Sequence, residues 1–201
     1  AGEDTHYQWP LQKAGAYVVF VQLLGKHGQR DAQDLQDACA HGFEQEWIAD
    51  ACFFDTAAAQ EECWKIREDV AALELHAPHN QHFDISIPIG DIGQIMNDIL
   101  SQLQHIEGVL GAYPFGHVAD GNMHLIVGKE NNSQQLTKQI NEIVYQPLAA
   151  VKGSISAEHG IGMDKKPYLQ LSRSQDEIKL MKGLKQLFDP KNILNPSRIV
   201  N

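Results

Sequence analysis

An Asp-Gly pair between two apolar stretches places the strongest constraint on the fold of this chain. Asp120-Gly121 is preceded by Ala-Tyr-Pro-Phe-Gly-His-Val at 112–118 and followed by Asn-Met-His-Leu-Ile-Val at 122–127. Asp-Gly between alternating apolar residues is a strong short-range signal for a two-residue hairpin turn. The sequence therefore predicts a β-hairpin within 111–128, and with it an antiparallel sheet.

The same hairpin brings two histidines together. With a two-residue turn at the Asp-Gly pair, His117 lies directly opposite His124, with Cβ atoms about 4.5–5.5 Å apart. Glu158 ends a short extended segment, where Ser154 and Ser156 share its face. Two imidazoles and a carboxylate with an open position are typical of a catalytic zinc, manganese or ferrous iron site. A hydrogen-bonded histidine pair beside an ordinary strand-end acid explains the same residues without a metal, and spacing alone favours neither interpretation.

Two further residues have types that suit such a site. His159 follows Glu158 directly, so it points away from the metal unless Gly160 and Gly162 let the chain turn. A neutral histidine there could act as a general base, although a lone loop histidine is the commoner case. Arg67, three residues after a tryptophan on a predicted helix, suits bidentate binding of a carboxylate, although such arginines usually lie on a solvated surface.

Periodicity along the rest of the chain predicts strands and helices in alternation. The expected strands are at 16–24, 46–53 and 83–89, and the expected helices at 31–41, 56–75, 91–105, 133–151 and 174–188. This order indicates an α+β sandwich, in which helices cover a mostly antiparallel sheet and a helical tail follows.

Charge and cysteine content exclude some classes of partner. A net charge of −10 with only 16 basic residues argues against binding to nucleic acid or an anionic membrane surface. No apolar stretch approaches the roughly 20 residues that span a bilayer. The three cysteines form no Cys-x-x-Cys pair, which favours reduced thiols and a cytoplasmic location. Because the first residue is alanine, we expect the chain to be part of a longer protein.

Four motifs carry a resemblance to a known family. Residues 116–124, Gly-His-Val-Ala-Asp-Gly-Asn-Met-His, resemble the Gly-His-x-x-Asp-Gly-Asn-x-His signature of the FAD-linked oxidase C-terminal domain. This domain is shared by D-lactate dehydrogenases, glycolate oxidase subunits and D-2-hydroxyglutarate dehydrogenases of the vanillyl-alcohol oxidase superfamily. Three further matches follow the family's order and extend the resemblance over almost the whole chain: 64–68, 156–162 and 188–196.

The resemblance implies a fold and a reaction. The implied fold is a ferredoxin-like α+β domain that caps a flavin held by an N-terminal FAD-binding domain, which is absent from this chain. The implied metal ligands are His117, His124 and Glu158, and the implied base is His159, which removes the hydroxyl proton of a D-2-hydroxyacid while a hydride passes to FAD. The substrate would be of the lactate, glycolate or 2-hydroxyglutarate type, and the electron acceptor a quinone, a cytochrome or an electron-transfer flavoprotein.

The resemblance also implies substrate and cofactor contacts. Arg67 is expected to bind the substrate carboxylate and Asn122 to line the site. His82 stands at a substrate-binding position where hydroxyglutarate-type members carry lysine, so binding of a second carboxylate is in question. Asn195 and Arg198 belong to Asn-Pro-Ser-Arg, in place of the usual Asn-Pro-Gly-Lys, and are expected to contact the cofactor.

Two other functions remain open from the sequence. A stand-alone metal-dependent hydrolase would use the same ion to activate water and would need no second domain. A non-catalytic ferredoxin-like binding module would use the histidines structurally. The full-length enzyme is expected in the cytoplasm, either free or at the periphery of the inner membrane. The chain lacks a glycine-rich flavin-binding loop, so we expect it to bind flavin weakly when alone.

Overall fold

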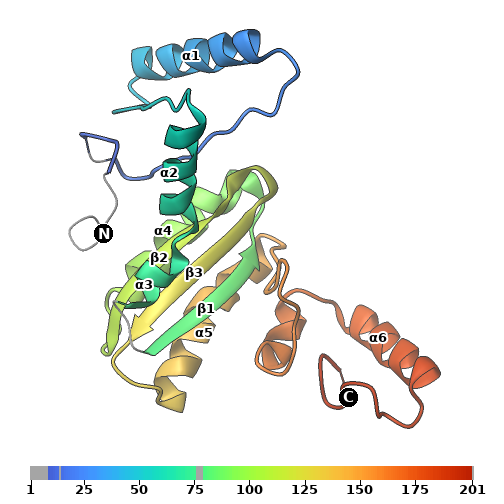
Figure 1. Cartoon of the computed structure of the whole chain (residues 1–201). Coiled ribbons are helices and arrows are strands. Elements are labelled where there is room, and N and C mark those ends of the chain that lie inside the picture. The colour runs from blue at the N-terminus through green and yellow to red at the C-terminus, as the bar shows by residue number, and fades with distance from the viewer. Residues whose placement is uncertain (1–8, 14, 76–78, 201) are drawn as a thin grey trace. The chain divides into compact units, whose positions relative to one another are not determined.

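The computed structural model describes residues 9–13, 15–75 and 79–200. The chain divides into two compact units, one extending to Val70 and the other beginning at Ala71 (Figure 1). The second unit contains the sheet and the predicted hairpin, and it therefore carries most of the residues predicted for the site.

Two helices are the regular elements of the first unit. α1 spans Gly28–Glu44 and α2 spans Ala57–Glu68. The hydroxyl of Thr56 accepts the backbone N–H of Ala59, which caps α2 as its sequence predicts. Both predicted helices are confirmed, although the second is interrupted after α2 and continues as the short α3 (Val70–Leu75).

The strands predicted at 16–24 and 46–53 are wrong. Neither segment pairs with a strand in the described part of the chain, and Val19 and Leu24 are 71% and 88% exposed. β-branched and aromatic residues favour an extended backbone, but a strand forms only when a neighbour takes up its backbone hydrogen bonds. The composition of these segments therefore predicts their extended character and not a place in a sheet.

Three antiparallel strands form the sheet of the second unit. They are β1 (His79–Ser86), β2 (Val109–His117) and β3 (Asn122–Lys129), in the spatial order β1-β3-β2. α4 (Ile92–Leu103) and α5 (Gln134–Ala150) cover one face of this sheet (Figure 1). This arrangement confirms the predicted α+β class, with helices over an antiparallel sheet.

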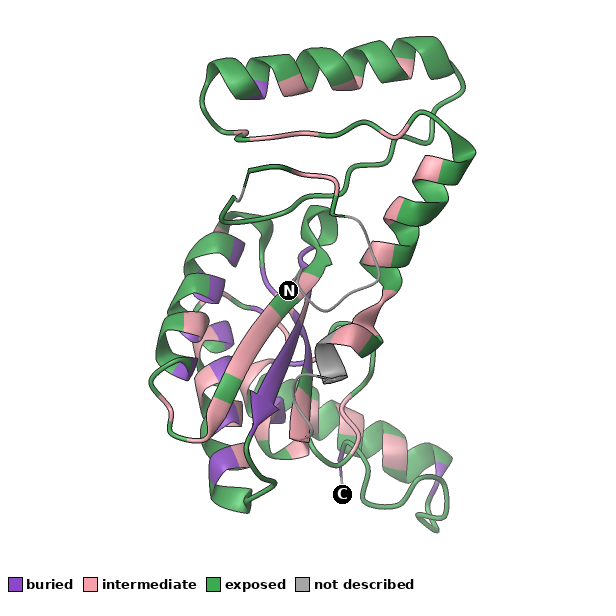
Figure 2. Ribbon diagram, turned by 60° about the vertical axis from the view of Figure 1, so that its left-hand side comes forward, coloured by how far each residue is buried: buried purple, intermediate pink, exposed green. Residues whose placement is uncertain are grey.

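The core lies between the sheet and these two helices. Alternation along β1 and β3 directs Phe83, Ile85, Leu125 and Val127 towards the helices, and each is at most 2% exposed. The helices contribute apolar residues at spacings of three and four: Ile95, Ile99, Leu103, Ile140, Val144 and Leu148. Burying one such side chain stabilises the fold by about 1.5–3 kcal/mol. Figure 2 shows that β3, the central strand, is buried along most of its length.

α6 (Gln175–Phe188) forms the predicted helical tail. Its first turn has a capping box, in which Ser174 accepts the backbone N–H of Glu177 and the Glu177 carboxylate accepts that of Ser174. One stripe of the helix consists of exposed apolar side chains: Leu180, Leu184, Leu187 and Phe188. Within the described ranges, no helix combines the length and the apolar character needed to cross a membrane.

Candidate functional site

The face of the sheet away from α4 and α5 carries the polar residues of the candidate site. Residues opposite one another on paired strands project to the same face. Two neighbouring rows run across β1, β3 and β2 on the face away from the core: Asp84, His124 and Phe115 in one, and Ser86, Asn122 and His117 in the other. The fold therefore places two of the predicted histidines and one buried carboxylate on one surface.

The hairpin forms where it was predicted, but its register differs. His117 lies opposite Asn122, and His124 lies opposite Phe115, so the predicted direct pairing of the two histidines is wrong. The connection is longer than two residues because a 3-10 turn at 118–120 precedes Gly121, which adopts a left-handed conformation (φ 76°). His117 and His124 are consequently diagonal neighbours on one face, a separation that long side chains can still bridge.

His124 is the half-buried centre of this face. Its ring stacks against the ring of His159 with centroids 5.7 Å apart, and the centroid of the Phe115 ring lies 5.4 Å away in a tilted arrangement. Burial lowers the pKa of His124, the nearby charges of Asp84 and Glu158 oppose that shift, and His159 and His117 add to it. All of these side chains are thus close enough to His124 to act on its charge.

Asp84 is the buried anion of the site, with 1% of the residue exposed. Its carboxylate accepts the backbone N–H groups of Glu158 (3.0 Å) and His159 (2.9 Å), and the hydroxyl of Ser156 (2.9 Å). The ammonium of Lys165 lies 3.1 Å from Oδ2. Desolvation raises the pKa of Asp84, but these donors outweigh it and hold the pKa well below its usual range, so the group is ionised.

Asn122 joins the hairpin to the segment that contains Glu158. Its side-chain nitrogen donates to the Glu158 carboxylate at 2.5 Å. Its Oδ1 is the buried side-chain polar atom that lacks a hydrogen-bond partner within the described residues. A buried acceptor without a donor costs about 1–3 kcal/mol. Such an atom beside a carboxylate and two histidines is suited to receive a ligand.

The donor set fits a divalent metal ion. Asp84, His124 and His159 offer ligand atoms that all lie within 4.8 Å of one another. His117 and Glu158, the other two members of the predicted ligand set, also lie near the His124 imidazole. Among the described residues, however, the ligand atoms of His117, His124 and Glu158 do not all lie within 4.8 Å of one another. Imidazole nitrogen and carboxylate oxygen are the ligands that zinc, manganese and ferrous iron share. The residues present can therefore hold one such ion.

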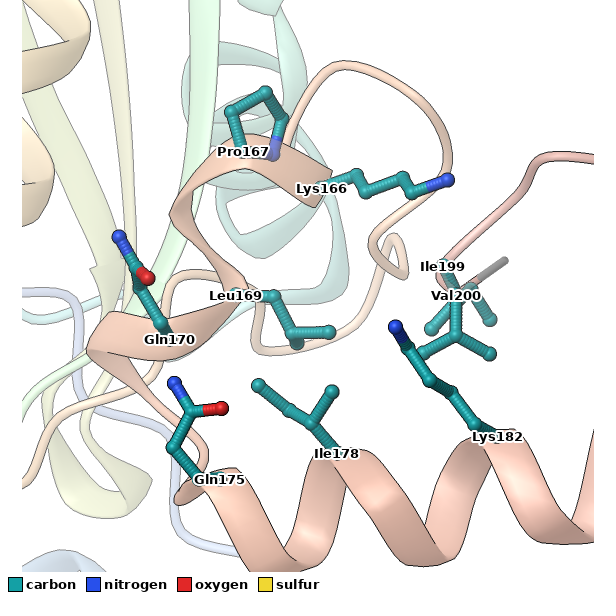
Figure 3. Close-up of a pocket in the computed structure, with 9 residues that line it drawn as sticks. All are labelled: Lys166, Pro167, Leu169, Gln170, Gln175, Ile178, Lys182, Ile199 and Val200. Carbon is teal, nitrogen blue, oxygen red and sulfur yellow. The ribbon is translucent and has the colours of Figure 1, made fainter.

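Two hollows lie near the C-terminal helices. One of about 270 Å³ runs behind the segment at 156–160 and includes Glu158 in its lining. The other, of about 240 Å³, lies between the 3-10 segment at 166–171 and α6, where Leu169 and Ile178 face one another (Figure 3). The second hollow contains none of the predicted site residues, so it carries no part of the proposed chemistry.

Comparison with known proteins assigns the chain to a family. The sequence profile of the family described as FAD linked oxidases, C-terminal domain, matches residues 1–199. The chain belongs to this family. It is 34% identical over 203 residues to a D-2-hydroxyglutarate dehydrogenase of Stutzerimonas stutzeri and 29% identical over 191 residues to the mitochondrial D-2-hydroxyglutarate dehydrogenase of Arabidopsis thaliana. It is also 30% identical over 202 residues to a mitochondrial Schizosaccharomyces pombe protein assigned by name to the D-lactate dehydrogenases.

These alignments cover most of this chain and a minority of each relative. They include 94%, 95% and 96% of the chain, but 42%, 34% and 38% of the Stutzerimonas, Arabidopsis and Schizosaccharomyces proteins. Family membership confirms the resemblance that the four motifs carry. The chain is thus comparable to one FAD-linked oxidase C-terminal domain, and it spans between 34% and 42% of the length of these relatives.

The predicted substrate contacts lie in different units. Arg67 is in α2 of the first unit, where its guanidinium stacks over the ring of Trp64 at 5.7 Å. His82 is on β1, two residues from Asp84 and on the same face, and its Nε2 is 2.8 Å from the Asn80 side chain. The structure thus places His82 beside the candidate site, and Arg67 stays a prediction from the family motif.

Asn195 and Arg198 lie in the loop that follows α6. The loop is anchored by Asp189, whose carboxylate accepts the backbone N–H groups of Ile193 (3.0 Å) and Leu194 (2.9 Å). Asn195 adopts a left-handed conformation (φ 46°), and its carbonyl accepts the backbone N–H of Arg198 at 3.3 Å. The loop that contains the two predicted cofactor contacts is therefore held by the Asp189 carboxylate and by a hydrogen bond within its own backbone.

Sequence reasoning missed two residues of the site. The sequence pattern places Asp84 in the predicted strand at 83–89 without marking it as a site residue, and it gives no sign of Lys165. Alternation places Asp84 on the opposite face from Phe83 and Ile85, where a polar residue is ordinarily solvated, so the sequence does not show that this carboxylate is buried. Nothing local marks Lys165, because its partner lies 81 residues away in the sequence.

Proposed function

We propose that this domain forms the metal-binding and substrate-binding side of an FAD-dependent dehydrogenase that oxidises a D-2-hydroxyacid to the 2-oxoacid. The observation that carries the proposal is the convergence of Asn122, His124, Glu158 and His159 at the face of the sheet away from α4 and α5. Family membership favours this oxidoreductase over the stand-alone hydrolase and the non-catalytic module.

His117, His124 and Glu158 would hold the divalent ion. An imidazole binds a metal only in its neutral form, and burial lowers the pKa of His124 and so keeps it neutral at physiological pH. Asn122 orients the Glu158 carboxylate through the hydrogen bond between their side chains. When bound, the ion would polarise the substrate hydroxyl and orient it.

His159 would accept the proton of that hydroxyl. Its ring stacks against that of His124, and the residue is exposed, so substrate can reach it. A base in this position contributes typically 10²–10⁴-fold to the rate. FAD, held mainly by the N-terminal FAD-binding domain, would accept the hydride from the α-carbon. Asn195 and Arg198 would contact the cofactor from the loop after α6.

Arg67 would bind the substrate carboxylate, and His82 would contact the remainder of the substrate. All D-2-hydroxyacids present the same α-hydroxycarboxylate head, so the proposal covers substrates of the lactate, glycolate and 2-hydroxyglutarate types. A quinone, a cytochrome or an electron-transfer flavoprotein would reoxidise the flavin. A cytoplasmic location stays a prediction, and the names of two relatives mention mitochondria.

Rapid mixing of the intact flavoprotein with D-lactate, glycolate and D-2-hydroxyglutarate tests the assignment of the base. We expect His159→Asn to slow flavin reduction by about 10²-fold or more while the flavin content stays unchanged. His105→Asn serves as the control, because His105 is an exposed residue at the end of α4 that bonds to the carbonyl of Ser101. Reduction of the His159→Asn flavin at the wild-type rate would remove His159 from the mechanism.

Metal analysis tests the ligand set. We expect His124→Ala and Glu158→Gln to lower the content of bound zinc, manganese or iron in the purified intact protein, and His105→Asn to leave it unchanged. Equal metal content in the wild-type protein and the His124→Ala variant would exclude His124 as a ligand.

A further inference from the structure

We propose that Asp84 is the positioning residue of the site, and that its carboxylate fixes the backbone turn on which Glu158 and His159 are presented. The inference rests on the proposed roles of these two residues. Asp84 belongs to β1, a strand that precedes the turn by more than 70 residues, and it is almost completely buried. It therefore acts through the residues that it holds.

The backbone N–H groups of this turn all donate to one carboxylate, that of Asp84. Three successive backbone N–H groups, those of Ala157, Glu158 and His159, donate to Asp84 at 2.9–3.2 Å. The hydroxyl of Ser156 donates to the same carboxylate at 2.9 Å. Consecutive N–H groups that point at one anion require a curled backbone and exclude an extended strand. The segment after Ser156 consequently turns around Asp84.

This curl allows two adjacent residues to face the same site. In an extended strand the side chains of Glu158 and His159 would point to opposite sides. In the structure the Glu158 carboxylate bonds to Asn122, and the His159 ring stacks on His124. Both partners lie on β3, two residues apart, so their side chains share one face of the sheet. The anchor therefore explains how a ligand and a base can be neighbours in sequence.

Lys165 completes the anchor. Its ammonium lies 3.1 Å from Asp84 Oδ2 and 3.0 Å from Ser156 Oγ, and its side chain is 12% exposed. The lysine thus neutralises the buried carboxylate and holds it towards the turn.

The same contacts decide between an anchor and a metal ligand. Asp84 also lies within 4.8 Å of His124 and His159 and could in principle coordinate an ion with them. Its Oδ2, however, already receives hydrogen bonds from Ser156 and His159 and faces the ammonium of Lys165, and its Oδ1 accepts the backbone N–H of Glu158. A carboxylate oxygen whose lone pairs are used in this way is a poor ligand. The geometry therefore favours an anchor.

Amide hydrogen exchange of the intact protein tests the anchor without reference to activity. We expect Asp84→Asn to speed exchange at Glu158 and His159 by at least about tenfold, because the variant loses the negative charge and replaces one of the two acceptor oxygens with an NH2 donor that cannot accept their hydrogen bonds. Exchange at Leu125 and Val127 in β3 should remain slow, which shows that the sheet is intact. Unchanged exchange at Glu158 and His159 in a folded Asp84→Asn protein would overturn the proposal.

Asp189→Asn is the matched control. Asp189 is also buried, ion-pairs with a lysine and accepts two backbone N–H groups, but it anchors the loop after α6. We expect this variant to leave both the exchange at 157–159 and the zinc affinity at wild-type values. An equal effect of the two substitutions at 157–159 would mean that any buried aspartate produces it, and would refute the positioning role.

Lys165→Met and Ser156→Ala keep the proposal testable if Asp84→Asn does not fold. Zinc affinity is measured by competition with a chromophoric chelator. If Asp84 is an anchor, Lys165→Met loosens the turn and weakens zinc binding by about tenfold, as losses of supporting residues typically do. If Asp84 is a ligand, removing the competing ammonium strengthens zinc binding, and the proposal fails. Ser156→Ala should speed exchange at 157–159 by a smaller factor, and no change there would count against the anchor.

Failure of the proposed function gives a different pattern. In that case Glu158→Gln and His159→Asn change neither metal content nor flavin reduction, while Asp84→Asn still frees the amides of Glu158 and His159. The exchange experiment thus reports on the anchor, and the ligand and base variants report on the function.

Discussion

The substitution Gly121→Ala tests how the hairpin is locked onto the rest of the second unit. Gly121 has φ +76°, and a Cβ atom there would lie 2.2 Å from the carbonyl oxygen of Ile87. Contacts below 3.0 Å essentially never occur for Cβ atoms, so the two backbone segments must separate by about 0.8 Å. The carbonyl of Gly121 accepts the backbone N–H of Ile87 at 2.9 Å, and this separation would break that bond.

The structure allows the cost to be estimated. A left-handed conformation costs alanine about 1 kcal/mol relative to glycine, and the lost hydrogen bond costs about 1 kcal/mol. Displacing packed backbone adds about 1–3 kcal/mol. We therefore expect Gly121→Ala to lower the free energy of unfolding by about 3–5 kcal/mol. Gly160→Ala is the control, because Gly160 has φ +78° but a Cβ there meets no described atom within 4 Å, so about 1 kcal/mol is expected.

Urea unfolding followed by far-ultraviolet circular dichroism measures this difference. Tryptophan fluorescence is unsuitable, because the three tryptophans, Trp9, Trp47 and Trp64, all lie in the first unit. Amide exchange at Met123 and Leu125 assigns the loss to the sheet. If Gly121→Ala and Gly160→Ala reduce the free energy of unfolding equally, the contact with Ile87 does not limit the hairpin and the reasoning is wrong.

Two further predictions concern stability. Ser197 adopts φ +63°, so Ser197→Gly should raise the free energy of unfolding by about 1 kcal/mol and the thermal midpoint by about 2–4 °C in calorimetry; a lower midpoint would contradict this. Burial lowers the pKa of Lys129 below its usual 10.5, so the unfolded state binds more protons between the two pKa values and wild-type stability rises with pH there. Lys129→Met should lack that rise, as measured by urea unfolding at pH 7 and pH 10; a parallel pH dependence in both proteins would count against this account.

The fold was predictable where its signals are local. The Asp-Gly pair located the hairpin, because turn residues act within a few positions, and helical spacing located α4, α5 and α6. The register was not predictable, because the 3-10 turn at 118–120 depends on long-range contacts such as that of Gly121 with Ile87. The segments at 16–24 and 46–53 show the same limit, since strand composition cannot supply a partner strand.

The residues of the candidate site were easier to propose from the sequence than their geometry. His117, His124, Glu158 and His159 were found by spacing and motif, and the structure gathers them around His124. The sequence left open how His159 could turn back towards its neighbours. We propose that Asp84 provides this turn, and its hydrogen bonds to residues 157–159 span 73 to 75 residues of sequence, so no local pattern around Glu158 indicates them.

The long span between Asp84 and its turn also has a consequence for folding. The hydrogen bonds of Asp84 close loops of 72 to 75 residues, so the chain must collapse around the sheet before they can form. Closing long loops is entropically unfavourable and is delayed until many contacts offset the cost. The candidate metal centre would thus be among the last parts of the second unit to mature during refolding. Zinc added to early refolding species would then meet scattered histidines and no assembled site.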